Sequence, residues 1–193
     1  MTFPLFETIA IVNGEIQHLA LHQQRYAASL ATFYGEKGAK VQDLAKIIQI
    51  STALEHTQHA PIIRCRIDYN QQDCDVHYFP YQRKIYRTFQ PVICDEINYD
   101  LKYADRALLN QLFAQRGDCD EIMIIKHGKV TDCSIGNLVF RQGEQWFTPD
   151  SPLFYGTQRA WLLQQGKIQA RSILLQEITQ FEEIRLINAL NPL

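Results

Sequence analysis

A few residues in the second half of the chain combine the type and setting that chemistry requires. Lys102 stands where an extended segment gives way to a helical pattern, so its amine could act as a nucleophile or exchange a proton. Asp132 leaves the end of a strand-like run at the start of a turn of small residues. Gly156 precedes another helical pattern, and the free backbone N–H groups of such a helix start suit a phosphate. Each also has an ordinary interpretation by itself, as a surface lysine, a turn aspartate and a helix start that binds nothing.

Several well-known functional patterns are absent from the sequence. Residues 35–40 include glycine and lysine, but without the GxxxxGK[ST] spacing or a preceding strand, and there is no GxGxxG, GxSxG or HExxH. The five cysteines have irregular gaps and no CxxC pair, which favours neither a disulfide framework nor a zinc site. His56 and His59 have helical spacing but no third ligand nearby in the sequence, so we expect no metal site.

The composition is that of an ordinary globular protein. Of the 193 residues, 46% are hydrophobic and 21% charged, which excludes a disordered or fibrous chain. The 19 basic and 21 acidic residues give a formal charge of −2, without the basic surplus of a nucleic-acid binder. There is neither an apolar run of roughly 20 residues nor a signal-peptide pattern. We therefore expect a cytoplasmic protein with no nucleic-acid or membrane partner.

The first half of the chain reads as a small α+β lobe. Asn13-Gly14 between two strand-like runs predicts a β-hairpin. Apolar residues at helical spacing predict two helices, and two more strands surround a polar turn at residues 70–73. The expected strands cover residues 6–12, 15–19, 61–69 and 74–81, and the expected helices cover 19–33 and 41–54.

The charged segment 81–86 is the predicted linker, so we expect one lobe over residues 1–82 and a larger one over 83–193, which would contain Lys102. The second lobe begins with an extended piece and a helix from about residue 104 that Gly117 ends. The remaining expected elements are hairpins at 121–132 and 137–148, a helix at 157–165, a strand at 168–175, a helical turn at 176–181 and a strand at 183–188.

Read in order, these segments resemble the class IV aminotransferases, the pyridoxal-phosphate enzymes of fold type IV. The group includes branched-chain and D-amino-acid aminotransferases and 4-amino-4-deoxychorismate lyase, and two details, Lys102 followed by Arg106 and the Asn188-Ala189-Leu190 run, are most similar to the lyase. The resemblance implies a two-lobed α+β fold like that of D-amino-acid aminotransferase, shortened at both ends. The matching motifs are Phe6-Glu7-Thr8, His22 to Arg25, Lys102 with Arg106, Val130-Thr131-Asp132 with Asn137, Thr148-Pro149, Gly156 to Arg159, and Asn188-Ala189-Leu190.

The resemblance also implies catalytic roles for two residues. Lys102 would carry pyridoxal 5'-phosphate as a Schiff base and, once released, would move a proton as general acid and base. Asp132 would face the pyridine nitrogen, where a carboxylate keeps the ring protonated so that it can accept electrons. The family usually has glutamate at this position, and the aspartate side chain of Asp132 is one methylene shorter.

Four further residues would hold the cofactor. Arg25 would grip the phosphate as a two-pronged donor. Thr157 and Gln158 would donate backbone N–H groups at their helix start, although Gly156-Thr157-Gln158-Arg159 replaces the commoner GxTR pattern. Asn188 would add a polar contact.

The implied reaction is that of 4-amino-4-deoxychorismate lyase, which releases pyruvate and leaves 4-aminobenzoate for folate synthesis. One alternative is an amino-acid transaminase of the branched-chain or D-amino-acid type. A third possibility of a different class is a relative that binds the cofactor without turnover, or a structural dimer. In each case the resemblance implies a homodimer, and for the enzymes a small amino compound as substrate.

Overall fold

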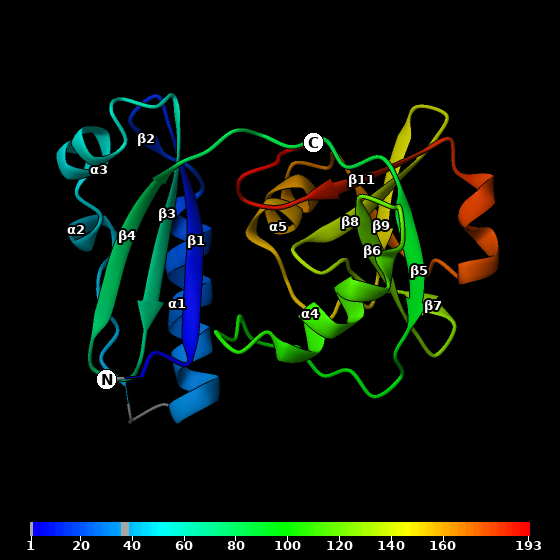
Figure 1. Cartoon of the computed structure of the whole chain (residues 1–193), viewed down its shortest axis with the longest axis horizontal. Helices are drawn as coiled ribbons and strands as arrows, with labels where there is room; N and C mark the ends of the chain where they lie inside the picture. Colours follow the sequence, from blue (N-terminus) through cyan, green and yellow to red (C-terminus); the bar gives the residue numbers. More distant parts are fainter. Residues whose placement is uncertain (1, 36–38) are drawn as a thin grey trace. The chain divides into compact units, whose positions relative to one another are not determined.

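The structure is a computed structural model that describes residues 2–35 and 39–193. The chain divides into two compact units (Figure 1). The first unit comprises Met1–Arg83 and Leu101–Asp105, and the second comprises Lys84–Asp100 and Arg106–Leu193. The glycine- and lysine-containing segment at 35–40 lies partly outside the described residues.

The first unit is an α+β layer structure with an antiparallel sheet in the order β2-β1-β3-β4. The Asn13-Gly14 turn joins β1 to β2 with positive φ at both residues, as the hairpin prediction requires. The strands are β1 (Leu5–Val12), β2 (Glu15–Ile16), β3 (Ile62–Tyr69) and β4 (Cys74–Pro80), and the helices are α1 (Leu19–Tyr34), α2 (Leu44–Ile47) and α3 (Ile50–His56).

The single helix expected over residues 41–54 is wrong, because the chain forms two short helices there. Ile48 and Gln49 have extended backbone between α2 and α3. The Gln49 backbone N–H donates to the Tyr78 hydroxyl of β4 at 2.8 Å instead of continuing a helix. A partner from a distant strand therefore overrides the local helical periodicity.

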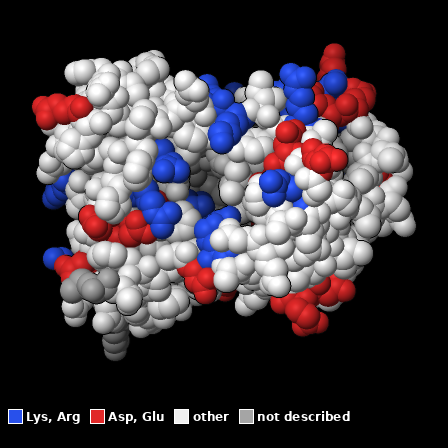
Figure 2. Space-filling model, viewed as in Figure 1, with Lys and Arg blue, Asp and Glu red and all other residues white. Residues whose placement is uncertain are grey.

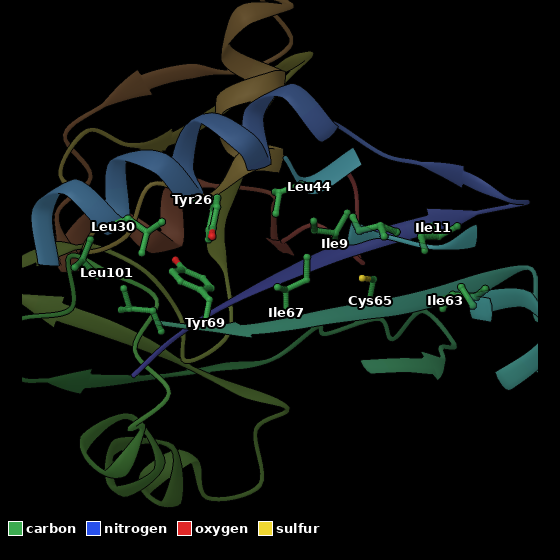
Figure 3. Close-up of a cluster of buried hydrophobic side chains, with 13 residues drawn as sticks. Ile9, Ile11, Tyr26, Leu30, Leu44, Ile63, Cys65, Ile67, Tyr69 and Leu101 are labelled. Atoms are coloured by element: carbon green, nitrogen blue, oxygen red, sulfur yellow. The ribbon is translucent and has the colours of Figure 1, made fainter. Parts of the chain in front are cut away.

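One face of this sheet packs against α1 to form the core of the first unit. Alternate residues of β3, including Ile67, are buried, as the period of a half-buried strand requires. Most residues of β1 are buried on both faces, and Ile9 and Ile11 belong to the same core. Figure 3 shows these side chains directed toward Tyr26 and Leu30 of α1. The register of β1 against β3 then places Glu7 on the same face.

The segment Leu101–Asp105, which we expected in the second lobe, groups with the first unit. It runs beside the start of β1: the Phe6 N–H donates to the Lys102 carbonyl at 3.0 Å, and the Ala104 N–H donates to the Pro4 carbonyl at 2.7 Å. Leu101 is buried in the same core as Ile9. The helix expected from residue 104 begins only at Ala107, because these preceding residues are engaged by β1.

The second unit contains two sheets, in the orders β10-β9-β8-β11 and β5-β6-β7. Both expected hairpins are confirmed, since β6 pairs with β7 and β8 with β9 in antiparallel fashion. The expected strand at 168–175 is shorter than predicted. The strands are β5 (Phe89–Ile93), β6 (Glu121–Lys126), β7 (Lys129–Val130), β8 (Asn137–Gln142), β9 (Gln145–Pro149), β10 (Gln169–Arg171) and β11 (Glu183–Ile187), and the helices are α4 (Ala107–Phe113), η1 (Ala114–Arg116), α5 (Thr157–Gln164) and η2 (Leu175–Gln180).

The surface carries charges of both signs. On the face drawn in Figure 2, basic and acidic side chains form small groups amid uncharged surface, and several basic groups lie beside acidic ones. In the part of the chain that the structure describes, no helix has the length and hydropathy needed to cross a membrane.

Candidate active site

Lys102 lies in the first unit, in the segment that runs beside β1. Its Nζ is 4.9 Å from the centroid of the Phe6 ring, and the Arg66 guanidinium carbon is 4.0 Å from the same centroid. Cations are attracted to the face of an aromatic ring at such distances. The Phe6 ring therefore orients the Lys102 side chain, whose backbone is fixed by the bond to Phe6.

Arg25 is held by a buried carboxylate. Its Nε donates to Glu7 Oε1 at 2.8 Å and its Nη2 donates to Glu7 Oε2 at 2.5 Å, while His22 Nδ1 lies 3.0 Å from Oε2. Residues three apart share one face of a helix, so His22 and Arg25 of α1 both reach Glu7 of β1. The FET and HxxR motifs thus meet in one cluster.

This cluster changes the expected role of Arg25. The Nε–Nη2 edge of its guanidinium is bound to Glu7, so that edge is not the fork that would meet a phosphate. The assignment of Arg25 to the phosphate stays a prediction.

Asp132 is a buried carboxyl group at the turn between β7 and β8. Its carbonyl accepts from the Ile124 N–H at 2.8 Å, which continues the β6–β7 pairing past Val130. The Phe154 N–H donates to Oδ2 at 2.9 Å, and the Asn137 side chain donates to Oδ1 at 2.7 Å. Burial raises the pKa of Asp132 to about 6, although these two hydrogen bonds and the nearby Arg159 charge oppose the shift.

Asn137 is a site residue whose role the sequence analysis missed. Its Nδ2 donates both to Asp132 and, at 2.8 Å, to the Phe154 carbonyl, so it joins the acidic turn to the loop that leads into α5. Gly156 lies against it, because a Cβ at residue 156 would overlap the Asn137 Oδ1. In the sequence, the only indication of this role is the spacing of an aspartate and an asparagine five positions later. The bond from Asn137 to the Phe154 carbonyl could not be predicted from that spacing, because residue 154 is distant in the sequence.

The start of α5 contains Thr157 and Gln158, both buried. Arg159 explains the last position of the GxxR motif: its Nη2 donates to the Pro149 carbonyl at 2.8 Å, and its Nε donates to Thr148 Oγ1 at 3.2 Å. Arg159 therefore links α5 to the end of β9. The Thr148-Pro149 motif and the GxxR motif contact each other through these two hydrogen bonds.

Asn188 follows β11 and lies beside the turn that contains Asp132. Its Nδ2 donates to the Ile135 carbonyl at 3.2 Å, and its Oδ1 accepts from the backbone N–H groups of Leu190 and Asn191. These contacts shape the turn after β11. Its expected contact with a cofactor stays a prediction.

The six expected site residues divide between the units. Lys102 and Arg25 lie in the first, where they are anchored on the consecutive β1 residues Phe6 and Glu7. The second unit contains the four others, and its hydrogen bonds link two of the turns that bear them. These four are Asp132, Thr157, Gln158 and Asn188.

Comparisons with known proteins agree with this architecture. The family model described as Amino-transferase class IV matches residues 100–193. An uncharacterized protein of Haemophilus influenzae is 61% identical over 191 residues, which are 99% of this chain and 100% of that protein.

Two solved structures show the fold. A crystal structure from Haemophilus somnus, described as that of a "putative 4-amino-4-deoxychorismate lyase", matches with a TM-score of 0.94 and 58% identity over 100% of this chain and 99% of that one. The PLP-bound form of a hypothetical aminotransferase from Mycobacterium tuberculosis matches with a TM-score of 0.79 and 15% identity, over 98% of this chain and 78% of that one. The two-lobed α+β fold inferred from the motifs is thereby confirmed. The chain belongs to the class IV aminotransferase family, whose members are pyridoxal-phosphate-dependent enzymes of fold type IV.

Proposed function

We propose that this member of the family is a 4-amino-4-deoxychorismate lyase that releases pyruvate and 4-aminobenzoate and so serves folate synthesis. The observation that carries the proposal is the buried Asp132 carboxylate, held by two N–H donors, on a chain 58% identical to the Haemophilus somnus protein so described. The order of the motifs from Phe6 to Leu190 supports it further.

The environment of Asp132 fits the ring nitrogen of pyridoxal phosphate. Each carboxylate oxygen accepts one N–H bond and retains further acceptor capacity. Because burial makes the ionised form of Asp132 costly, a cationic partner such as a protonated pyridine nitrogen would stabilise it. When bound, the cofactor supplies an electron sink for the carbon next to the substrate nitrogen.

The chain's own residues then have distinct tasks in the proposal. Lys102 holds the cofactor covalently and moves the proton that the substrate loses. Arg25 binds the phosphate together with the backbone N–H groups of Thr157 and Gln158, and Asn188 adds a polar contact. These assignments rest on the motif positions, on the buried helix start of α5 and on the fixed guanidinium of Arg25.

A transaminase of the branched-chain or D-amino-acid type is the second candidate, favoured by the match of residues 100–193 to the class IV aminotransferase model. The two reactions differ in their co-substrate, because a transaminase needs a keto-acid acceptor and the lyase does not. A relative that binds the cofactor without turnover is the remaining outcome, since Asp132 replaces the usual glutamate.

One experiment separates these outcomes. Purified protein is loaded with pyridoxal phosphate, its visible spectrum is recorded, and it is mixed with aminodeoxychorismate while pyruvate is assayed. The lyase proposal predicts pyruvate without any keto acid, and Lys102→Ala should abolish it. Pyridoxal-phosphate absorbance without pyruvate, or turnover of amino acids only with a keto acid, would contradict the proposed reaction. A protein that takes up no cofactor would contradict the whole proposal.

We also propose that the protein is a homodimer, as the family resemblance implies. Sedimentation equilibrium of the purified chain should give twice the 22.4 kDa of one chain. A monomer at micromolar concentration would contradict this.

A further inference from the structure

Glu7 is a completely buried carboxylate to which the proposed function gives no task. Its side chain is 0% exposed, and both of its oxygens accept bonds from Arg25 in a fork of two parallel contacts at 2.8 and 2.5 Å. His22 Nδ1 is the third partner, at 3.0 Å. Burying a carboxylate is costly unless it is paired, so this arrangement needs an explanation.

The charges in the cluster are well defined. Burial alone would raise the pKa of Glu7, but the Arg25 charge and the hydrogen bonds from His22 and Arg25 outweigh it and lower the pKa to about 2. Glu7 is therefore ionised at neutral pH and can only accept hydrogen bonds. Burial lowers the pKa of His22, so its ring is neutral with the proton on Nδ1, facing Glu7.

The geometry restricts the Arg25 guanidinium to one orientation. An arginine side chain has many rotamers, and ordering it costs conformational entropy. Two parallel bonds to Glu7 fix the plane of the guanidinium as well as its position, and His22 fixes the carboxylate in turn. The side chain of Arg25 remains 14% exposed, so the guanidinium is held near the surface of the first unit rather than enclosed in it.

We propose that Glu7 is a positioning residue that orients Arg25 for the phosphate of pyridoxal phosphate. The fork engages Nε and Nη2 of Arg25, so it sets the position and plane of the whole guanidinium before any phosphate is bound. This inference rests on the proposed function, because it assumes that Arg25 meets the phosphate. The Glu7 carboxylate also places a negative charge close to the phosphate, which opposes binding. In the proposal, the gain from an Arg25 guanidinium that is already oriented offsets this repulsion.

The proposal and a purely electrostatic account predict opposite effects of Glu7→Gln on the affinity for the cofactor phosphate. Glu7→Gln removes a negative charge, so charge alone would make the cofactor phosphate bind more tightly. If Glu7 acts by orientation, the same variant binds it more weakly, because the amide of Gln cannot accept two bonds from the guanidinium fork.

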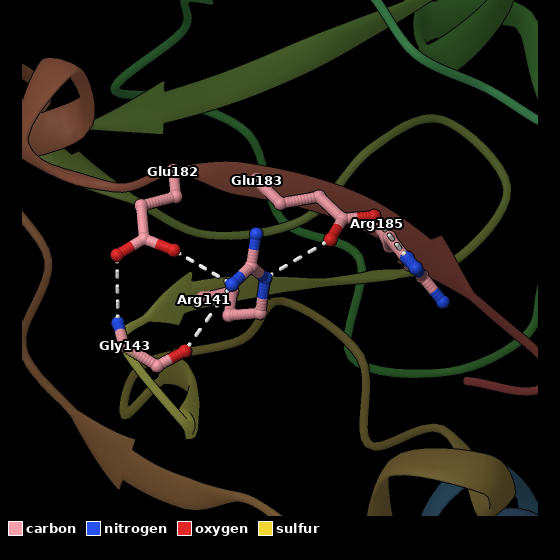
Figure 4. A network of polar contacts seen from close by, with 5 residues as sticks. All are labelled: Arg141, Gly143, Glu182, Glu183 and Arg185. Atoms are coloured by element: carbon pink, nitrogen blue, oxygen red, sulfur yellow. Dashed lines mark hydrogen bonds and ion pairs between the residues drawn. The ribbon is translucent and has the colours of Figure 1, made fainter.

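The test compares the affinities of the apoprotein for pyridoxal phosphate and for pyridoxal, which lacks the phosphate, by fluorescence titration. The proteins are wild type, Glu7→Gln, Arg25→Ala and the double variant. Glu183→Gln is the control, because Glu183 also pairs with arginines, at 3.1 Å to Arg141 and 2.5 Å to Arg185. Figure 4 shows that network at the start of β11, and its Arg141 and Glu183 side chains are partly exposed in the second unit.

We expect Glu7→Gln and Arg25→Ala each to weaken binding of pyridoxal phosphate by about tenfold or more and to leave pyridoxal binding unchanged. The double variant should be no worse than Arg25→Ala alone, since both changes remove the same contact. Glu183→Gln should behave as wild type with both ligands.

Several outcomes would overturn the inference. Equal losses for pyridoxal phosphate and pyridoxal would show that Glu7 only supports the fold, and tighter or unchanged phosphate binding in Glu7→Gln would show that orientation is unimportant. If Glu7→Gln does not fold, Arg25→Lys decides, because lysine keeps the charge but cannot form the fork; retention of the wild-type preference for the phosphorylated ligand would then refute the role. A wild type that binds neither ligand contradicts the proposed function instead.

Discussion

Two buried carboxyl groups, Glu7 and Asp132, have pKa values shifted in opposite directions because their partners differ. Glu7 pairs with a guanidinium, so its pKa is lowered to about 2 despite burial. Asp132 accepts bonds from neutral N–H groups, and burial prevails to raise its pKa to about 6. A carboxylate bonded directly to a guanidinium suits a structural tie, whereas a carboxylate that accepts hydrogen bonds from neutral N–H groups, and whose pKa stays raised despite the nearby Arg159 charge, suits a ligand that brings a positive charge.

The raised pKa of Asp132 predicts a specific pH dependence of the apoprotein. Between the unfolded pKa near 3.8 and the folded pKa of about 6, the folded state binds more protons, so this group's contribution to stability falls as pH rises through that window. The free energy of unfolding of wild type relative to Asp132→Asn should therefore fall by up to about 3 kcal/mol between pH 4 and pH 7. Urea denaturation of both proteins across this pH range measures the two free energies of unfolding. If their difference does not change with pH, the pKa of Asp132 is not raised in the folded state.

The charge of Asp132 should matter more for turnover than for retention of the cofactor. Asp132→Asn is nearly isosteric but cannot stabilise a protonated pyridine nitrogen, so we expect turnover to fall by about 100-fold or more with little change in cofactor content. Asp132→Glu, which keeps the charge, is the matched variant and should retain much more activity than Asp132→Asn. Equal activity of wild type and Asp132→Asn in the pyruvate assay would remove the electronic role.

At the scale of elements, Glu7 ties β1 to α1 and should make the first unit sensitive to acid. Its folded pKa lies below the unfolded value of 4.5, so its stabilising contribution is complete above pH 4.5 and is lost as pH falls toward 2. The loss should approach about 3 kcal/mol and should be absent in Glu7→Gln. Circular dichroism during acid titration measures this, and a parallel acid transition in both proteins would contradict it.

The loop before α5 packs on the Asp132 turn through Gly156 and Asn137. A Cβ at residue 156 would overlap Asn137 Oδ1, so Gly156→Ala should lower the free energy of unfolding by about 1–3 kcal/mol. Asn137→Ala removes the obstructing group, and the double variant should lose less than the sum of the single losses. Strict additivity in urea denaturation would show that the two residues do not press on each other.

At the scale of the whole molecule, the chain crosses between units twice around Lys102. Leu101, which follows a stretch of the second unit, is 8% exposed in the core of the first. Leu101→Ala should therefore cost about 2–4 kcal/mol and increase hydrogen exchange in β1 and β3 of the first unit. Leu108→Ala, at a site 43% exposed, is the control and should change little. Increased exchange confined to the second unit would contradict this assignment.

The local sequence was sufficient for those elements whose conformation depends on adjacent residues. The Asn13-Gly14 and His127-Gly128 turns have positive φ at both positions, a geometry that these residue types favour, and each joins the hairpin that was predicted. The order of motifs likewise sufficed to identify the family. Local preference and spacing are properties of the chain itself, so they can be read before any packing is known.

Tertiary structure alone decided which distant groups meet. Glu7 could be recognised as part of a motif, but its pairing with Arg25 depends on the register of β1 against β3 and on the packing of α1. The break at Gln49 and the return of Leu101 to the first core likewise require partners far along the chain. Such contacts are selected by burial and by the need to satisfy buried polar groups, and both are defined only when the whole chain is folded.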